Sequence, residues 1–365
     1  MSVLEQQGQG SRLRTPFWSV FVNKNDILTG IIDFEVTNAS HFAADTYRLT
    51  AAIDNLPPDL GLSYWGDSTG DELEIFAGFK DQSGSGQSQS LIFGQVDDVA
   101  VDIVGRTLTL SGRDLSAQFL DTKTATDYSD KTSSQIVQII AGNHKMASSV
   151  APTQEWVGSF YELYHSRITK DQSEWDLLMF LAEQENYDVW VAGQTLYFQP
   201  PVPLTTDPYV LLWSDQGQGQ RTANFEDLKM QRSQTLARDV VVKVQSWNQA
   251  QGITVTSTLT RNQTNKSPRP SQPQTFTFYP PNLNKEQADK FARGKMEDIT
   301  KHERVITGKL PADSLLTNRS LVKLTGTGTA WDQSYHVDTV TRRMSFKEGY
   351  TMEFRAKNHS PKSTV

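Results

Sequence analysis

The chain has 365 residues, of which 37% are hydrophobic, with a formal net charge of -7 and no cysteine. This length supports two or three domains with their own cores, and the hydrophobic content excludes a wholly disordered chain. The absence of cysteine excludes disulfides, thiolate metal ligands and a cysteine nucleophile, and the negative charge argues against binding nucleic acid through released phosphate counterions.

The N-terminal segment, residues 1–13, is rich in Gln, Gly and Ser and is predicted to be flexible. It lacks the apolar core of a signal peptide, and no run in the chain approaches the about 20 apolar residues that a membrane span needs. We therefore expect a soluble cytoplasmic product with no membrane partner.

Residues 14–112 have the pattern of a first β domain. Short apolar or alternating runs are separated by turn formers, which is typical of an antiparallel barrel or sandwich. The predicted strands are 17–22, 31–36, 47–53, 72–77, 91–96, 97–103 and 107–110. Residues 81–90, with the sequence DQSGSGQSQS, are predicted to form a flexible hairpin tip.

The pattern changes to a small α+β domain over residues 113–205. Residues 113–120 are amphipathic, and Thr132 followed by Gln135 has the spacing of a capping box that starts a helix. The apolar residues of that helix lie on one face, and the helix is expected to end at residues 142–143.

The stretch 168–201 predicts a helix followed by a β-hairpin. Ser173 has N-cap spacing to Asp176, Asn186 is the expected stop, and residues 187–198 form two strands around a Gly-containing turn. Trp175, Phe180 and Trp190 are expected in the core of this unit, and Phe180→Ala is therefore expected to cost about 3–5 kcal/mol of stability.

Residues 206–221 are predicted to be a linker, after which the β pattern returns over residues 222–357. Asn284 is expected to cap a helix, residues 261–273 to form a long loop, and residues 358–365 to be a flexible tail. The predicted strands are 239–244, 253–259, 274–279, 304–308, 320–324, 335–340 and 350–354. Each β region ends on two alternating strands, 93–112 and 335–354, so two related and superimposable barrels that flank the insert are expected.

No residues of this chain form a recognisable catalytic, cofactor-binding or metal-binding motif. The six histidines have no close metal-ligand spacing, and residues 326–329 fit a β-turn better than a phosphate cradle. Glu183 and Glu185 beside Tyr187 and Trp190 are candidates for a sugar-cleaving pair, but glutamates at a helix end are usually solvated. Eight scattered tryptophans fit cores and interfaces better than a carbohydrate platform.

Five segments in a fixed order carry a resemblance to a family. They are residues 112–121, 131–137, 172–183 with the strand at Tyr187, 335–340, and 349–351. In this order they resemble the baseplate hub proteins of contractile-tailed phages, the Mu-like hub and late control protein D family, over about residues 15–356. The chain departs from the family pattern at Arg342, where many members carry a histidine, and in the 261–273 loop.

The resemblance implies a mainly β fold with an α+β insert, in which two tube-like β-barrel domains flank the small α+β domain. It implies a structural protein of the virion tail baseplate, not an enzyme, that is assembled in the host cytoplasm. Such a hub forms a homotrimeric ring that adapts the sixfold tail tube to the threefold central spike. Its partners are the spike, the tail tube or tape measure protein and other baseplate proteins, and DNA passes through the lumen without specific binding. A tail-associated cell-wall glycoside hydrolase and the hub part of a type VI secretion spike remain alternatives.

Overall fold

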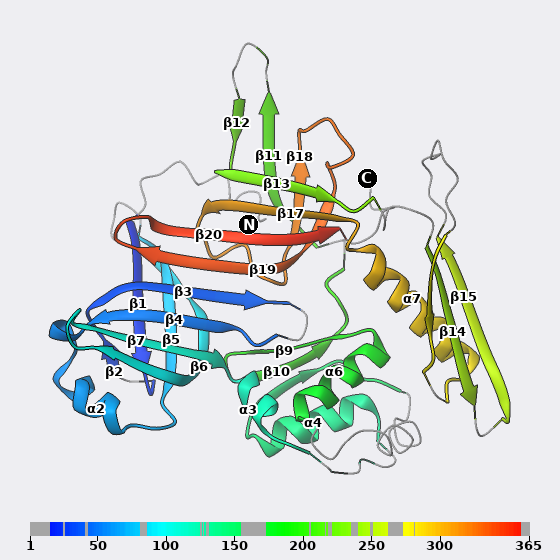
Figure 1. Ribbon diagram of the computed structural model, residues 1–365, viewed down its shortest axis with the longest axis horizontal. Helices are drawn as coiled ribbons and strands as arrows, with labels where there is room; N and C mark the ends of the chain where they lie inside the picture. Colours follow the sequence, from blue (N-terminus) through cyan, green and yellow to red (C-terminus); the bar gives the residue numbers. More distant parts are fainter. Residues whose placement is uncertain are drawn as a thin grey trace.

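The computed structural model describes residues 15–358, apart from 25, 41–42, 81–85, 125, 127, 129–130, 155–172, 204–205, 216, 218–220, 235–239, 249–250, 262–272 and 281. The expected flexible ends (1–13 and all but the first residue of 358–365), most of the 261–273 loop and half of the 81–90 hairpin tip lie outside these residues. The fold is mainly β with an α+β insert, as the sequence predicts (Figure 1).

The first β region is antiparallel, and its strands β3 and β7 alternate largely between buried and partly buried positions. Its strands are β1 (Thr15–Val22), β2 (Asp26–Leu28), β3 (Ile31–Ala39), β4 (Thr46–Ala52), β5 (Glu72–Lys80), β6 (Gly86–Asp102) and β7 (Thr107–Asp114). Short helices η1 (Ile53–Asn55), η2 (Pro58–Leu60) and α2 (Leu62–Asp67) connect β4 to β5.

The two strands expected at 91–96 and 97–103 are one long strand, β6. The apparent break between them is a β-bulge between Val96 and Asp98, which shifts the register against β7 without ending the strand. Residues 86–90, expected in a hairpin tip, pair with β5 instead.

The insert is a separate α+β unit below the large sheet in Figure 1. It contains α3 (Ser116–Asp121), α4 (Ser133–Asn143), β8 (Ala147–Val150), α6 (Glu174–Glu185), β9 (Asp188–Ala192) and β10 (Thr195–Gln199), with strand order β8-β10-β9. The capping box predicted at Thr132 forms, Ser173 caps α6 as its spacing to Asp176 predicts, and Asn186 ends α6 in the left-handed conformation. Its core is distinct from that of the large sheet.

Of the three aromatic residues expected in the core of the insert, only one is fully buried. Trp175 is 2% exposed, but Phe180 is only partly buried at the edge of this core. Trp190 is also partly buried, and it stacks on Tyr197 with ring centroids 4.9 Å apart. Phe180 lies at the margin of the buried face of α6, and Trp190 lies on the face of β9 opposite the buried Val189 and Val191, a distinction that an apolar run does not reveal.

Phe180→Ala is therefore expected to cost about 1–2 kcal/mol, less than for a fully buried phenylalanine, because part of the ring is already in contact with water. Leu181→Ala, which truncates a fully buried neighbour on the same helix, is the matched control and should cost more. Urea unfolding followed by tryptophan fluorescence measures both changes. An equal loss of stability in the two variants would contradict the burial argument.

The second β region continues the same sheet. Its strands are β11 (Tyr209–Asp215), β12 (Arg221–Ala223), β13 (Asp227–Arg232), β17 (Arg304–Pro311), β18 (Leu321–Thr325), β19 (Ser334–Ser345) and β20 (Gly349–Asn358). β19 pairs with β3 from Thr339↔Ala39 to Ser345↔Asp33. This pairing joins both β regions into one 14-stranded sheet with one shared core. Among the described residues, the strand pairs close neither region into a barrel of its own.

Two predicted boundaries need correction. Tyr209–Asp215 is strand β11 inside the predicted 206–221 linker, because a parallel pairing with β18, far away in sequence, brings its apolar residues into the main core. Asn358 belongs to β20 and not to a flexible tail, because its side chain is fully buried and accepts a hydrogen bond from the Arg304 backbone N–H.

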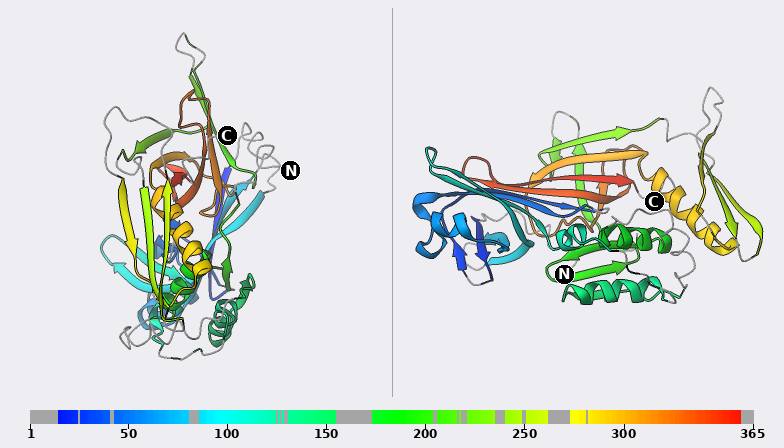
Figure 2. Two further views of the ribbon diagram at one scale, coloured as in Figure 1. Left: turned by 90° about the vertical axis from the view of Figure 1, so that its right-hand side faces the viewer. Right: turned by 60° about the horizontal axis from the view of Figure 1, so that its bottom comes forward.

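Part of the predicted second barrel is a unit with its own core. It contains β14 (Val240–Asn248), β15 (Ile253–Arg261), β16 (Gln274–Phe278) and α7 (Lys285–Thr300), and α7 begins at the predicted cap, Asn284. Figures 1 and 2 show this unit projecting to one side of the molecule. No helix in the described part of the chain is long and apolar enough to span a membrane.

Candidate functional site

A cavity of about 450 Å³, lined by both apolar and charged side chains, lies where the first β region, the insert and the second β region meet. The first region contributes Asn38, Asp45 and Asp114, the insert contributes Trp175 and Trp190, and the second region contributes Asn318, Arg319 and Arg342. Charged groups of the two β regions and aromatic rings of the insert therefore meet in one place.

Two aspartates of the first region have unusual environments here. Asp45 accepts hydrogen bonds from Asn38 Nδ2 and from the Ala39 backbone N–H, both at 2.8 Å. Asp114, which is 6% exposed, accepts from the Ser116 hydroxyl at 2.5 Å. Burial raises the pKa of Asp45 to about 6, and burial together with the nearby Asp45 charge raises the pKa of Asp114 to about 8.

Arg342 connects the two β regions from inside the fold. It is 3% exposed, and its guanidinium donates to Asn38 Oδ1 at 3.2 Å, to the Asp313 carbonyl at 3.2 Å and to the Leu316 carbonyl. Asn38 belongs to β3 and Arg342 to β19, so this contact reinforces the strand pair that joins the regions.

Arg319 connects the second region to the insert. It pairs with Asp188 of β9 at 3.3 Å, and its guanidinium carbon lies 4.2 Å from the centre of the Trp190 ring. Burial lowers the pKa of Arg319, with the Asp188 and Asp45 charges acting in the opposite direction. The geometry is that of a cation–π contact combined with an ion pair, which fixes the insert against the large sheet.

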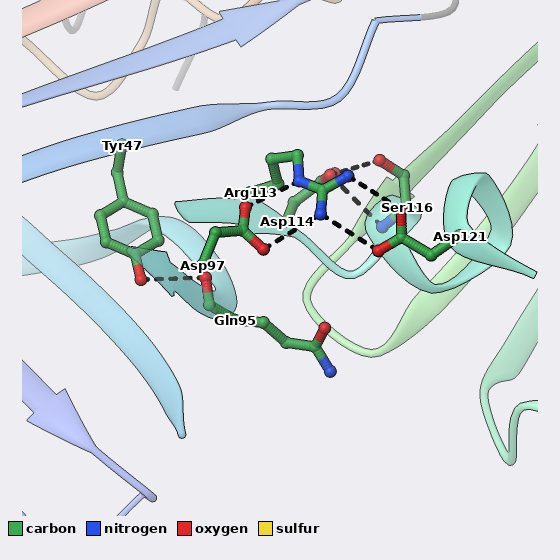
Figure 3. Close-up of polar contacts among 7 residues, drawn as sticks. All are labelled: Tyr47, Gln95, Asp97, Arg113, Asp114, Ser116 and Asp121. Carbon is green, nitrogen blue, oxygen red and sulfur yellow. Dashed lines mark hydrogen bonds and ion pairs between the residues drawn. The ribbon is translucent and has the colours of Figure 1, made fainter. Parts of the chain in front are cut away.

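A third arginine, Arg113, lies where the chain passes from β7 into the insert (Figure 3). Arg113 makes a bidentate contact with Asp97 of β6 at 2.7 and 3.0 Å, and it also contacts Asp121 of α3. Tyr47 donates to the Gln95 carbonyl at 3.0 Å beside it. Gly112 is required there because a Cβ would lie 1.9 Å from the Gln95 oxygen.

The carboxylates weighed as a sugar-cleaving pair are held by lysines of α7. Glu185 is 8% exposed and accepts from Ser133 Oγ at 3.0 Å and from Lys290 Nζ at 2.8 Å. The more exposed Glu183 pairs with Lys295 at 3.1 Å. Both contacts attach the projecting unit to the insert, and Glu183 lines a second cavity between the insert and α7 together with Lys290 and Lys295.

Removing the two carboxylates one at a time is expected to lower the free energy of unfolding by unequal amounts. Glu185→Ala should lower the free energy of unfolding by about 2–4 kcal/mol, because it leaves the Ser133 hydroxyl and the Lys290 ammonium without their acceptor. Glu183→Ala, the matched control, should lower it by about 0–1 kcal/mol because that pair is partly solvated. Urea unfolding measures both, and comparable losses would show that burial does not distinguish the two carboxylates.

The remaining candidate groups are accounted for by local structure. His144 contacts Glu174 at 2.5 Å within the insert. The backbone N–H groups of Thr327 and Gly328 donate hydrogen bonds to the Asp332 carboxylate, so the 326–329 segment already binds a carboxylate of the same chain. His41, His165 and His359 lie outside the described residues. Within the described part of the chain, no group of three His, Cys, Asp or Glu side chains has metal-binding geometry.

Sequence reasoning identified Trp175 and Trp190 but not the role of the charged residues of the cavity. Arg342 was noted only as a departure from a family pattern, although the alternation of β19 places it on the same buried face as Val340 and Met344. A charge on a core face is a usable signal for a buried contact. Asp114 carries the same signal, since the alternation of β7 places it on the buried face with Leu108 and Leu110. Asp45 and Arg319 lie in connections and carry none.

Comparisons with known proteins give a clear answer for the fold. Neither protein-family models nor curated proteins give a match. Among solved structures, a tail protein from Neisseria meningitidis MC58 matches with a TM-score of 0.70 and 16% identity, over 96% of this chain and 99% of that one. The chain has the fold of phage tail proteins.

Two further prophage tail proteins match along nearly their full length. The 43 kDa tail protein of prophage MuSo2 from Shewanella oneidensis has a TM-score of 0.63 at 13% identity, over 95% of this chain and 99% of that one. A prophage tail protein of Listeria monocytogenes EGD-e has a TM-score of 0.60 at 12% identity, over 95% of each chain. A type VI secretion component of E. coli matches less closely, with a TM-score of 0.54 at 11% identity, over 93% of this chain and 77% of that one.

Proposed function

We propose that this protein is a structural component of a phage tail baseplate, a hub protein and not an enzyme. The observation that carries the proposal is the fold shared with prophage tail proteins over almost the whole length of both chains. The higher TM-scores to phage tail proteins than to the type VI component favour the phage form over the type VI alternative.

The site supports a structural role. Arg342 bonds Asn38 across the two β regions, and Arg319 pairs with Asp188 of the insert. The candidate carboxylates Glu183 and Glu185 are bound to lysines of α7. This arrangement makes the relative position of the β regions and the insert precise, which a ring subunit requires.

The proposed assembly is a homotrimer. The two β regions of each chain are the two halves of one sheet, so three copies place six β regions around the ring, which adapts a sixfold tail tube to a threefold central spike. The tail tube or tape measure protein and other baseplate proteins are the remaining partners, and the protein is located in the virion after assembly in the host cytoplasm. A formal charge of -7 suits a lumen through which DNA slides without being held.

Light scattering and negative-stain electron microscopy of the purified protein, alone and with the spike protein, test this proposal. A threefold ring with a central opening is expected in at least the second sample. A monomer in both samples, or salt-sensitive binding of duplex DNA, contradicts it. A zymogram on peptidoglycan tests the hydrolase alternative, and a cleared band would favour that enzyme.

A further inference from the structure

The long strand β6 extends beyond its neighbour β5. The β5–β6 ladder ends at Glu72↔Gln95, whereas β7 continues to pair with β6 as far as Asp102↔Thr107. One edge of residues 97–102 therefore faces no strand in the described part of the chain, and all six residues are exposed. An unpaired edge of this length is a template for another strand.

The side of this edge that faces the core is apolar and uncovered. Val99 lies opposite Leu110 in the register and Val101 lies opposite Leu108, and opposite residues of an antiparallel pair project from the same face. Leu108 and Leu110 are fully buried in the main core, yet Val99 is 39% and Val101 42% exposed. At this edge the apolar face of the sheet therefore continues beyond the core as two uncovered valines.

Strand β13 shows the same arrangement. It pairs with β17 along one edge, and its other edge faces no strand among the described residues. Met230 lies opposite Ile306, which is fully buried in the main core, but Met230 itself is 40% exposed. β13 spans six residues, the same length as the free edge of β6.

We propose that the free β6 edge, residues 97–102, pairs with the free β13 edge of a second copy of this chain. The proposal rests on the proposed function, since it names the contact that joins the copies of the ring. Pairing would bring the apolar faces of the two edges together. Val99 and Val101 of one copy would then be covered by the face of β13 that carries Met230 in the next copy. Within one chain the two edges are separated by six intervening strands of the sheet.

The charges on the opposite faces favour unlike edges over like edges. The outer face of the β6 edge carries Asp98 and Asp102, whereas that of β13 carries Lys229 paired with Asp227 at 3.5 Å and is neutral overall. A β6–β6 contact between copies would bring Asp98 and Asp102 of both chains together, which opposes pairing. The β6–β13 contact is head-to-tail, and such contacts form closed rings or open filaments.

Cross-linking tests the proposal without background, because the chain contains no cysteine. Ala100→Cys places a thiol on the outer face of β6 and Lys229→Cys places one on the outer face of β13. The two variants are purified separately, mixed in equal amounts and treated with a short bis-maleimide. A mixed cross-linked dimer is expected, well above the yield from Ala100→Cys mixed with Lys347→Cys, whose thiol is exposed in the turn after β19.

The outcomes separate this inference from the proposed function. Mixed cross-links in a closed three-copy ring support both, whereas mixed cross-links in open filaments support the edge pairing and overturn the ring. A three-copy ring without mixed cross-links above control overturns the edge pairing and leaves the proposed function standing. Cross-linked dimers of Ala100→Cys alone, or no cross-link in a monomeric sample, also overturn the edge pairing.

Discussion

Arg342→Ala is expected to lower the free energy of unfolding by about 3–5 kcal/mol, because three buried acceptors lose their donor at once. The guanidinium is 3% exposed and bonds Asn38 and two backbone carbonyls, so the loss falls on the strand pair that joins the β regions. Urea unfolding followed by circular dichroism measures the change. The two β regions of the variant should also unfold separately, so that the unfolding curve shows two transitions in place of one.

Arg343→Ala is the matched control on the next residue of the same strand. Arg343 points to the other face, is 42% exposed, and pairs with Glu35 at 2.6 Å and Glu353 at 2.9 Å. Exposed pairs contribute about 0–1 kcal/mol. A loss for Arg343→Ala as large as that for Arg342→Ala would refute the claim that the buried contact joins the regions.

Stability is expected to fall as the pH rises from about 4 to about 8, by about 2–4 kcal/mol through Asp45 and Asp114. Their pKa values in the folded protein, about 6 and about 8, lie above the ordinary value of 3.8. The folded protein therefore holds protons that the unfolded chain releases in this range. This contribution is fully present below the ordinary pKa and is lost as the pH rises through the folded pKa.

Asp114→Asn should remove most of this pH dependence, since the amide keeps an oxygen acceptor for Ser116 but cannot ionise. The measurement is the difference in thermal midpoint between the two proteins at pH values from about 5 to about 8. His302, whose pKa is lowered by burial and by Lys357 and Lys301, gives an opposite slope that cancels in this difference. Asp98→Asn removes an exposed carboxylate and should keep the full dependence. Parallel curves for wild type and Asp114→Asn would show that Asp114 does not hold its proton.

The local elements were predictable because their signals are local. The capping boxes at Thr132, Ser173 and Asn284 each join a side chain to a backbone group three residues away, and all three start a helix where expected. Alternation identified the paired strands that end each β region. In the structure both pairs are long antiparallel hairpins with a bulge, between Val96 and Asp98 in β6 and between Val337 and Thr339 in β19.

The sequence alone thus determined a mainly β chain with an α+β insert, the helix ends, and the absence of disulfides and thiolate sites. Only the tertiary structure decided that β3 pairs with β19 across about 300 residues of sequence, that β11 is a strand, and that Asp45, Asp114, Arg319 and Arg342 share one cavity. The physical reason is that capping and alternation are set by neighbours in the chain. Strand order and the burial of a charge depend instead on which distant segment covers it, and no periodicity in the sequence records that choice.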